Sequence, residues 1–233
     1  MKKNSKAILQ TLSDFIFPRH CYGCETPLKF YEKKICTSCL IQLPLTSFCT
    51  RIANPLYQKL SLRFPIQTAT SLFYFEKEGI LAHLIHLFKY SGAKELGFFL
   101  GSWLGACLKE GLIAEDIDAI VPVPLHPLKK RKRGYNQSEL IATALSKKMK
   151  RPLLSQGLIR VKNTTALAQL GKNERELEIQ HAFQTNLNIT DRSLHLLLVD
   201  DLLTTGATLS ACASTLLINS NIKISIAVLA CRL

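Results

Sequence analysis

Short apolar segments alternate with longer amphipathic ones along the chain beyond residue 66. Four apolar segments stand out, at residues 68–76, 116–125, 194–201 and 223–231. The third reads LHLLLVDD and begins as an almost continuous apolar run, which is typical of a central parallel strand buried on both faces. We therefore predict strands at these four positions.

Amphipathic or buried helices are predicted in the intervening sequence, at residues 79–92, 93–111, 136–150 and 207–219. The first stops at Gly92, and the third begins at Asn136, a residue suited to capping a helix. The alternation of strands and helices predicts an α/β fold for residues 66–233, with an open parallel sheet flanked by helices.

Residues 1–65 have a different pattern and are predicted to be a separate region. The first 18 residues are basic and then apolar at helical spacing, interrupted by Asp14, which favours a short amphipathic helix over a secretory signal. Capping of the main domain is the favoured role for this helix, and contact with a membrane surface is the alternative. Residues 43–65 contain three prolines and are predicted to connect the two regions.

The N-terminal region contains two matched cysteine pairs. The sequence HCYGCETPLKFYEKKICTSCL holds two C-x2-C pairs separated by eleven residues, enough for a hairpin that brings the pairs together. This spacing predicts a small module with a tetrahedral zinc site formed by Cys21, Cys24, Cys36 and Cys39. Four protein ligands leave no open position, so the predicted Zn²⁺ is structural.

Disulfide bonds are the main alternative for these cysteines. No secretory signal is recognised, so we expect the chain in the reducing cytoplasm, where disulfides are rare. Redox chemistry fits less well, because one C-x2-C pair would suffice for it. His20 could replace a ligand, although it is more simply a neighbour. The other cysteines lack paired spacing and are predicted to be buried or idle thiols: Cys49, Cys107, Cys212 and Cys231.

The formal net charge of +13 is unevenly distributed. Residues 1–65 carry a net +7 and residues 125–175 carry +11, whereas the other segments are acidic. This concentration indicates polyanionic partners, either phosphates or nucleic acid or both. Four aromatic residues lie near basic ones, where they could stack on bases, although aromatic side chains are more often core: Phe30, Tyr31, Tyr90 and Tyr135.

The strand at 194–201 ends in Asp200 and Asp201, and LLTTGAT follows. In a parallel α/β sheet, ligands bind beyond the carboxyl ends of the strands. The segment Thr204–Thr208 opens the next helix, where backbone N–H groups and threonine hydroxyls favour a phosphate, and Gly206 lets the backbone approach closely. Two carboxylates beside a phosphate site make sense if the ligand also has vicinal hydroxyls or brings a divalent cation. A ribose 5-phosphate meets both demands.

This string resembles the phosphoribosyl pyrophosphate (PRPP) motif of type I phosphoribosyltransferases. The resemblance assigns PRPP binding, with its Mg²⁺, to nine consecutive residues: Asp200, Asp201, Leu202, Leu203, Thr204, Thr205, Gly206, Ala207 and Thr208. A capped helix after a strand is the structural alternative, and it would explain one aspartate and one threonine but not the whole string.

In PRPP binders, the loop after the first core strand holds pyrophosphate. The corresponding segment here carries five basic residues and a glycine: Lys129, Lys130, Arg131, Lys132, Arg133 and Gly134. We expect Arg131 or Arg133 to reach the ligand, and the five basic residues are also candidates for nucleic-acid contact. A solvated basic run or a localisation tag is the alternative.

The chain as a whole resembles the ComF family of natural-competence proteins, of the ComFC type. The resemblance covers nearly the full length: the four-cysteine module, LIHLFKYSG, VPVPLHPLKKRKRGYNQSE, IRVKNTTALAQLGKNERELEIQHAF and the PRPP motif. It adds Lys89, Tyr90 and Arg175 to the candidates for the pyrophosphate site, and implies that the loop 164–175 closes over the ligand. The chain departs from the family at Leu202, where Val is common, and at Leu167, where Gln is common.

The resemblance implies a PRPP-binding competence protein that binds or helps to import incoming single-stranded DNA on the cytoplasmic side. Expected partners are single-stranded DNA, PRPP and other competence proteins, such as a DNA-uptake helicase or translocase. A cytoplasmic location is expected, with peripheral association at the inner face of the inner membrane, near a channel, as a further expectation.

A Mg²⁺-dependent phosphoribosyltransferase without a direct DNA role is the alternative function. The motif supports PRPP binding but names neither an acceptor nor catalytic residues. A purely structural zinc adaptor is a third alternative, which leaves the string from Asp200 to Thr208 unexplained.

Overall fold

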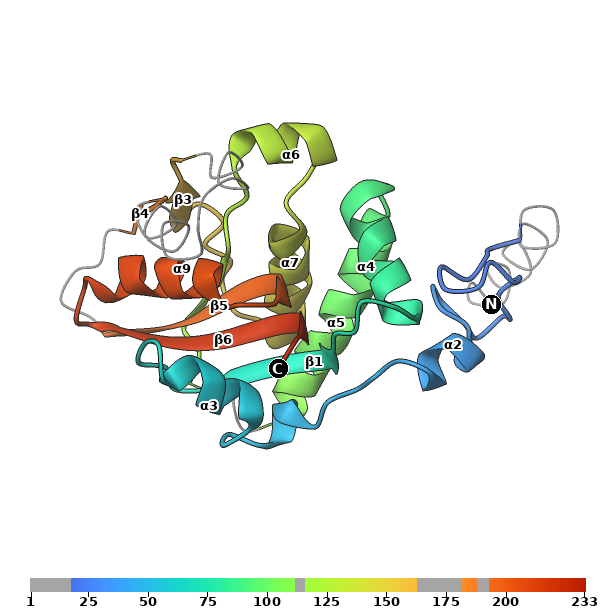
Figure 1. The fold of residues 1–233 in the computed structure, drawn as a ribbon, viewed down its shortest axis with the longest axis horizontal. Helices are drawn as coiled ribbons and strands as arrows, with labels where there is room; N and C mark the ends of the chain where they lie inside the picture. Colours follow the sequence, from blue (N-terminus) through green and yellow to red (C-terminus); the bar gives the residue numbers. More distant parts are fainter. Residues whose placement is uncertain (1–17, 112–115, 163–181, 188–192) are drawn as a thin grey trace, which may run out of the picture.

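A parallel sheet forms the centre of the fold. A computed structural model of the chain describes residues 18–111, 116–162, 182–187 and 193–233. Four strands lie side by side in the order β1 (Ala69–Tyr74), β6 (Ile222–Cys231), β5 (Leu194–Leu203) and β2 (Ala119–Pro122). Every neighbouring pair in this sheet is parallel, and the predicted α/β fold class is confirmed (Figure 1).

Helices cover both faces of this sheet. One face carries α4 (Ile80–Tyr90), α5 (Lys94–Glu110) and α7 (Gln137–Met149), and the other carries α3 (Pro55–Ser61) and α9 (Ala207–Leu217). Strand β5 contributes to both apolar clusters, with Leu197 in the first and Leu196 in the second. Because successive residues of a strand point to opposite faces, a strand between two helical layers is apolar at nearly every position.

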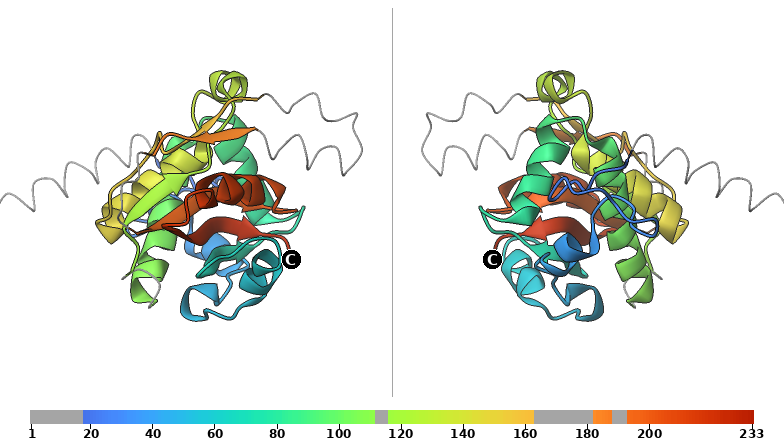
Figure 2. Two further views of the ribbon diagram at one scale, coloured as in Figure 1. Left: turned by 90° about the vertical axis from the view of Figure 1, so that its left-hand side faces the viewer. Right: turned by 90° about the vertical axis from the view of Figure 1, so that its right-hand side faces the viewer.

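The four-cysteine module lies against α4. Ile35, Cys36 and Cys39, the last of them in the short helix α2 (Thr37–Ile41), belong to the same apolar cluster as Leu81 and Leu84 of α4. Figure 1 shows the module beyond α4 at one end of the molecule, and the right-hand view of Figure 2 shows it in front of α4 and α5. The module is therefore packed onto the α/β domain.

The segment between the module and β1 contributes to the core of the α/β domain. The short helix η1 (Phe48–Thr50) and α3 bury Phe48, Leu56 and Leu60 among the residues of the second apolar cluster. Asn54 caps α3, because its side chain accepts a hydrogen bond from the backbone N–H of Tyr57 at 2.9 Å. The segment 43–65, predicted to be a connection, therefore also contributes side chains to the core on one face of the sheet.

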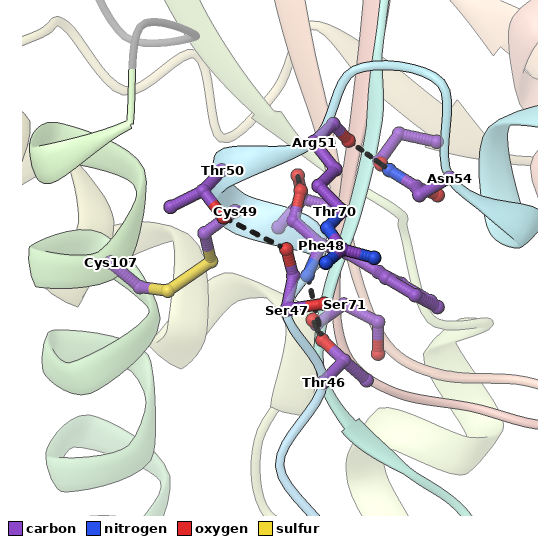
Figure 3. Close-up of a disulfide and its surroundings, with 11 residues drawn as sticks. Thr46, Ser47, Phe48, Cys49, Thr50, Arg51, Asn54, Thr70, Ser71 and Cys107 are labelled. Carbon is purple, nitrogen blue, oxygen red and sulfur yellow. Dashed lines mark hydrogen bonds between the residues drawn. A yellow bond between two sulfur atoms is a disulfide. The ribbon is translucent and has the colours of Figure 1, made fainter.

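A disulfide joins η1 to α5. Cys49 and Cys107 are bonded across 58 positions of sequence (Figure 3). The prediction that these two residues are idle thiols is wrong, because the bond depends on the packing of η1 against α5 and leaves no signal in local spacing. Cys212 and Cys231 are buried free thiols, as predicted.

Two features differ from the predicted elements. The basic segment after β2, expected to be a loop, is the helix α6 (Pro127–Arg133), which ends at Gly134 in the left-handed conformation with φ of 79°. The strands β3 (Leu158–Arg160) and β4 (Phe183–Thr185) form a separate antiparallel pair instead of joining the parallel sheet. Strands of three residues are too short to show a periodicity in the sequence.

None of the helices within the described ranges is long and apolar enough to span a membrane. The amphipathic helix predicted for the first 18 residues falls almost entirely outside these ranges.

Candidate functional site

The PRPP motif forms the carboxyl end of β5 and the turn into α9. The strand continues to Leu203, two residues beyond its predicted end, so that both aspartates lie within it. Gly206 then adopts the left-handed conformation with φ of 83°, and a Cβ atom there would lie 3.3 Å from Leu60 of α3. A glycine is therefore needed for the turn that starts α9 at Ala207.

Each of the two aspartates has a different partner. The Ser138 hydroxyl donates to Asp200 Oδ1 at 2.8 Å, and the backbone N–H of Asp201 donates to the same oxygen at 2.9 Å. Lys89 Nζ lies 2.9 Å from Asp201 Oδ2, in an ion pair whose side chains are both mostly buried. The end of β5 is therefore joined to α7 through Ser138 and to α4 through Lys89.

The pKa of Asp200 is raised to about 7. Burial of the carboxyl group is the main cause, and repulsion from Asp201 adds to it. The hydrogen bonds from Ser138 and from the Asp201 N–H, and the charge of Lys89, lower the pKa but do not cancel these effects. The Asp200 carboxylate is thus incompletely stabilised in the free protein, and a ligand offering hydroxyl donors or a cation would stabilise it.

A small cavity follows the aspartates at the start of α9. Its volume is about 40 Å³, and it is lined by Asp200 and residues 202–209. The first turn of a helix has backbone N–H groups without intrahelical partners, which makes this position suitable for an anion. The volume suits a phosphate-sized group, so a bound sugar would have to lie outside the cavity, over the aspartates.

Two further predicted residues join this site through α4. The guanidinium of Arg133 lies 5.3 Å from the centre of the Tyr90 ring and donates to Gln137 Oε1 at 3.2 Å. Tyr90 follows Lys89 at the end of α4, and 60% of its surface is exposed. Arg133 therefore contacts Tyr90, the residue after Lys89, and Lys89 in turn pairs with Asp201.

The remaining basic residues of α6 have unlike surroundings. Lys129 is partly buried, and burial together with the charges of Arg160 and Arg133 lowers its pKa. Lys130 forms an ion pair with Glu139 of α7 at 3.2 Å. Arg131 and Lys132 are exposed. The segment is thus a short basic helix without a fully buried residue, in which Lys129 is partly buried and Lys130 is paired.

The four aromatic residues proposed for base stacking separate into two groups. Tyr135 is buried, and its hydroxyl donates to the carbonyl oxygen of Phe88, so that it belongs to the core. Phe30, Tyr31 and Tyr90 are exposed. The stacking interpretation is therefore wrong for Tyr135, because its ring packs beneath α4 instead of facing solvent.

One candidate cannot be placed. Arg175, and with it the loop 164–175 that was expected to close over the ligand, lies outside the described residues.

The four cysteines of the N-terminal module form one cluster. All four sulfur atoms lie within 4.8 Å of one another, and the sulfurs of Cys24 and Cys36 are 3.6 Å apart. A zinc ion with sulfur ligands at about 2.3 Å requires a similar separation between the sulfurs, of about 3.8 Å. The Cys21 sulfur also accepts backbone N–H groups of Gly23 and Cys36, each at 3.2 Å.

The chemistry of this cluster fits a dication. The Thr26 side chain and backbone lower the pKa of Cys24 to about 6, whereas burial and the neighbouring thiols raise the pKa of Cys39 above its usual range. Four thiolates could not share this space without a positive charge among them. The residues present therefore fit a structural Zn²⁺, as predicted from their spacing.

Sequence reasoning missed two residues that complete the turn. Ser138 contacts Asp200, and its only sequence signal is its place in the first turn of a capped helix. Lys59 of α3 donates to the carbonyl oxygens of Thr204, at 3.2 Å, and Arg232, at 2.7 Å. Nothing in the sequence around Lys59 indicates this contact.

Known proteins resemble the N-terminal module and most of the length of the chain. The double zinc ribbon domain family matches residues 12–65. The DNA utilization protein YhgH of Salmonella typhimurium is 29% identical over 216 residues, which cover 87% of this chain and 92% of that protein.

Two competence proteins are similar over most of their length. Competence protein F of Haemophilus influenzae is 26% identical over 206 residues, covering 83% of this chain and 89% of that protein. Competence protein ComFC of Bacillus subtilis is 26% identical over 204 residues, covering 84% and 77%. These similarities confirm the predicted relationship to ComF-type proteins.

Proposed function

We propose, from the relationship of this chain to the ComF-type competence proteins, that it acts in natural transformation, binds PRPP and handles incoming single-stranded DNA on the cytoplasmic side. The names of the relatives support the role in transformation. The turn after β5 supports PRPP as the ligand.

One observation carries the PRPP assignment, namely the incompletely stabilised carboxylate of Asp200, with Asp201 next to it, beside a phosphate-sized cavity. Asp200 and Asp201 would accept hydrogen bonds from the vicinal hydroxyls of the ribose. The 5-phosphate would occupy the cavity at the start of α9. Lys89, which is paired with Asp201 in the free protein, would remain close to the negatively charged ligand.

Mg²⁺ is expected to accompany PRPP. The carboxylates of Asp200 and Asp201 and the hydroxyls of the turn are oxygen donors, the type that Mg²⁺ prefers. The ion would reduce the repulsion between the pyrophosphate group and these carboxylates. Binding of PRPP should therefore be stronger with Mg²⁺ than without it.

Calorimetric titration with PRPP and Mg²⁺ tests this site. Replacing both aspartates by alanine (Asp200→Ala with Asp201→Ala) should weaken binding by roughly 100-fold or more, because two hydrogen-bonding anions are lost. Asp116→Asn is the matched control, since this exposed carboxylate precedes β2 at the opposite end of the sheet. Equal affinity in the double variant and the wild type would refute the site.

The DNA role is tested by the salt dependence of binding. If α6 contacts the phosphate backbone, affinity for single-stranded DNA should fall linearly with ionic strength on a double logarithmic plot. Replacing Arg131 and Lys132 by glutamine should lower both the affinity and the slope. A complex that is insensitive to salt would contradict backbone contact.

Phosphoribosyl transfer to an unidentified acceptor is the second candidate function. The observation in its favour is that Lys89 pairs with Asp201 and that Arg133 contacts Tyr90, the residue after Lys89, since positive charge here would stabilise departing pyrophosphate. Release of pyrophosphate from PRPP in the presence of an acceptor would establish it. Binding without release, with or without single-stranded DNA, would favour PRPP as a regulatory ligand.

A further inference from the structure

We propose that the tip of the zinc module, residues Lys29–Lys33, is a rigid stacking platform for two bases of single-stranded DNA. The inference rests on the proposed DNA-handling function and assigns part of it to a surface far from the PRPP turn in sequence. Four observations carry it: the exposure of two adjacent rings, the bonds that fix them, the charge around them and a neighbouring groove.

The tip exposes two consecutive aromatic side chains. Phe30 is 76% exposed and Tyr31 is 67% exposed, which makes them the two most exposed aromatic residues in the described parts of the chain. A scattered exposed leucine needs no explanation, but two adjacent rings in solvent are unusual in a protein with a well-packed core. Flat aromatic faces of this kind are the groups on which unpaired bases stack.

A buried glutamate fixes the loop that presents the rings. Glu32 is only 7% exposed, and its Oε2 atom accepts the backbone N–H of Lys29 at 2.8 Å. Its other oxygen, Oε1, accepts the backbone N–H of Thr37 at 2.7 Å and the Thr37 hydroxyl at 2.9 Å. The Glu32 backbone N–H also donates to the Lys29 carbonyl at 2.9 Å, which closes a turn with Phe30 and Tyr31 as its central residues.

This turn is connected to the metal site. Thr37 directly follows the predicted zinc ligand Cys36 and begins α2. The chain after the rings is also held, because Arg19 Nη1 donates to the Glu32 carbonyl at 3.3 Å. A platform that is ordered before binding loses little conformational entropy when a ligand docks, so the rings are presented at low cost.

The charge at the tip complements a polyanion. Lys29 and Lys33 flank the rings and are exposed, whereas the one acidic residue of the tip, Glu32, has its carboxylate turned inward and bonded. The charged groups that the tip offers to solvent are therefore ammonium groups. Single-stranded nucleic acids are bound by aromatic rings, on which the bases stack, together with ammonium groups, which attract the phosphates.

A groove next to the tip allows a longer strand to continue. Its volume is about 470 Å³, and it is lined by Lys33, Lys34, Glu95, Phe98, Phe99 and Ser102. Lys147 of the neighbouring helix α7 lies 5.1 Å from the centre of the Phe98 ring of α5. The groove shares Lys33 with the tip, so a strand that leaves Phe30 and Tyr31 reaches a second aromatic surface with basic residues.

Fluorescence anisotropy with the full-length, zinc-loaded protein tests the platform. The probes are a labelled oligothymidylate of about 20 nucleotides and an abasic strand of the same length, which retains the phosphates but has no bases. The wild type should bind the oligothymidylate more tightly than the abasic strand. Phe30→Ala with Tyr31→Ala should weaken oligothymidylate binding by about 10-fold or more and leave abasic binding nearly unchanged.

The matched control replaces two exposed aliphatic residues elsewhere. Leu62 is 89% exposed and Ile218 is 84% exposed, so Leu62→Ala with Ile218→Ala removes comparable apolar surface. This control should bind both probes as the wild type does. Zinc content and the unfolding temperature of each variant verify that the module is intact.

Each contrary outcome has a distinct meaning. If the wild type binds oligothymidylate and the ring variant binds it equally well, the platform is refuted and the DNA role survives. If the wild type binds neither probe, the proposed DNA function itself fails. If the ring variant loses binding to vesicles of anionic lipid and not to DNA, the tip is a membrane-docking surface and the platform is again refuted.

Discussion

Two buried carboxyl groups of this protein have opposite pKa shifts. Glu32, in the zinc module, has its pKa lowered, mainly by the backbone N–H of Thr37 and then by that of Lys29. Asp200, at the end of β5, has its pKa raised to about 7, by burial and by the neighbouring charge of Asp201. One carboxylate has enough donors within the protein, and the other does not.

The difference separates a structural carboxylate from one that we propose to bind a ligand. Both oxygens of Glu32 accept hydrogen bonds from the turn that they hold. The carboxylate therefore has no need of a donor from a ligand. Asp200 has three compensating groups, Ser138, the Asp201 N–H and Lys89, which are too few to offset its burial and the charge of Asp201. Incomplete compensation lowers the stability of the free protein. A ligand that supplies the missing donors restores that stability when it binds.

Removal of zinc should give the largest effect and should be confined to one of the two regions. Structural zinc sites contribute roughly 10–16 kcal/mol in small peptides, so chelation should unfold the tip around Glu32. The turn after β5 lies in the parallel sheet and should retain PRPP binding. Hydrogen exchange of the module, measured beside a PRPP titration, checks this prediction. A module that keeps its protection after chelation would rule out the zinc assignment.

Removal of Lys89 should lower the free energy of unfolding, because it leaves the charges of the aspartate pair less compensated. Lys89→Met leaves Asp201 without its cation in a mostly buried position, and should destabilise the fold by roughly 1–2 kcal/mol. Denaturant unfolding near neutral pH measures the loss. Lys77→Met, at an exposed position, is the control and should have almost no effect. Equal stability of both variants would mean that the ion pair does not offset the repulsion.

Neutralising Asp200 should stabilise the protein while it weakens PRPP binding. A carboxyl group whose pKa is higher in the folded state than in the unfolded state loses stability as pH rises from about 4 to about 7. Asp200→Asn removes that loss, so the variant should gain on the order of 1 kcal/mol at about pH 8 and little at about pH 4. Thermal unfolding at the two pH values measures the difference, with Glu76→Gln at an exposed position as the control. A gain that is independent of pH would assign it to a cause other than ionisation.

Neutralising Glu32 should have the smallest effect on stability. It should destabilise the protein, whereas neutralising Asp200 should stabilise it. Its lowered pKa means that the stability it contributes is present above the unfolded pKa of about 4.3 and is lost as pH falls through the folded pKa. Glu32→Gln should therefore loosen the tip at neutral pH and matter less in acid. The amide exchange rates of Lys29 and Thr37 should rise, whereas Glu25→Gln in the same module should leave them unchanged. Exchange rates as slow as in the wild type would show that the carboxylate does not hold the turn.

The sequence alone determined the parts of this protein that depend on short stretches of chain. The continuous apolar run before Asp200 predicted a central strand, and the strand–helix alternation predicted the sheet. The spacing of the four cysteines predicted one metal cluster, and Asn136 was correctly predicted to cap α7. In each case the physical cause acts between residues close in sequence, so its pattern is visible there.

The tertiary structure alone decided which residues from distant parts of the sequence contact one another. Ser138 meets Asp200 across 62 positions and Cys49 meets Cys107 across 58. Tyr135 is buried beneath α4, although its basic neighbours made it look like a surface residue. Such pairs form only when helices from distant segments pack on the same sheet. Neither the compensation of Asp200 nor the inward turn of Glu32 could therefore be deduced from residue type and spacing.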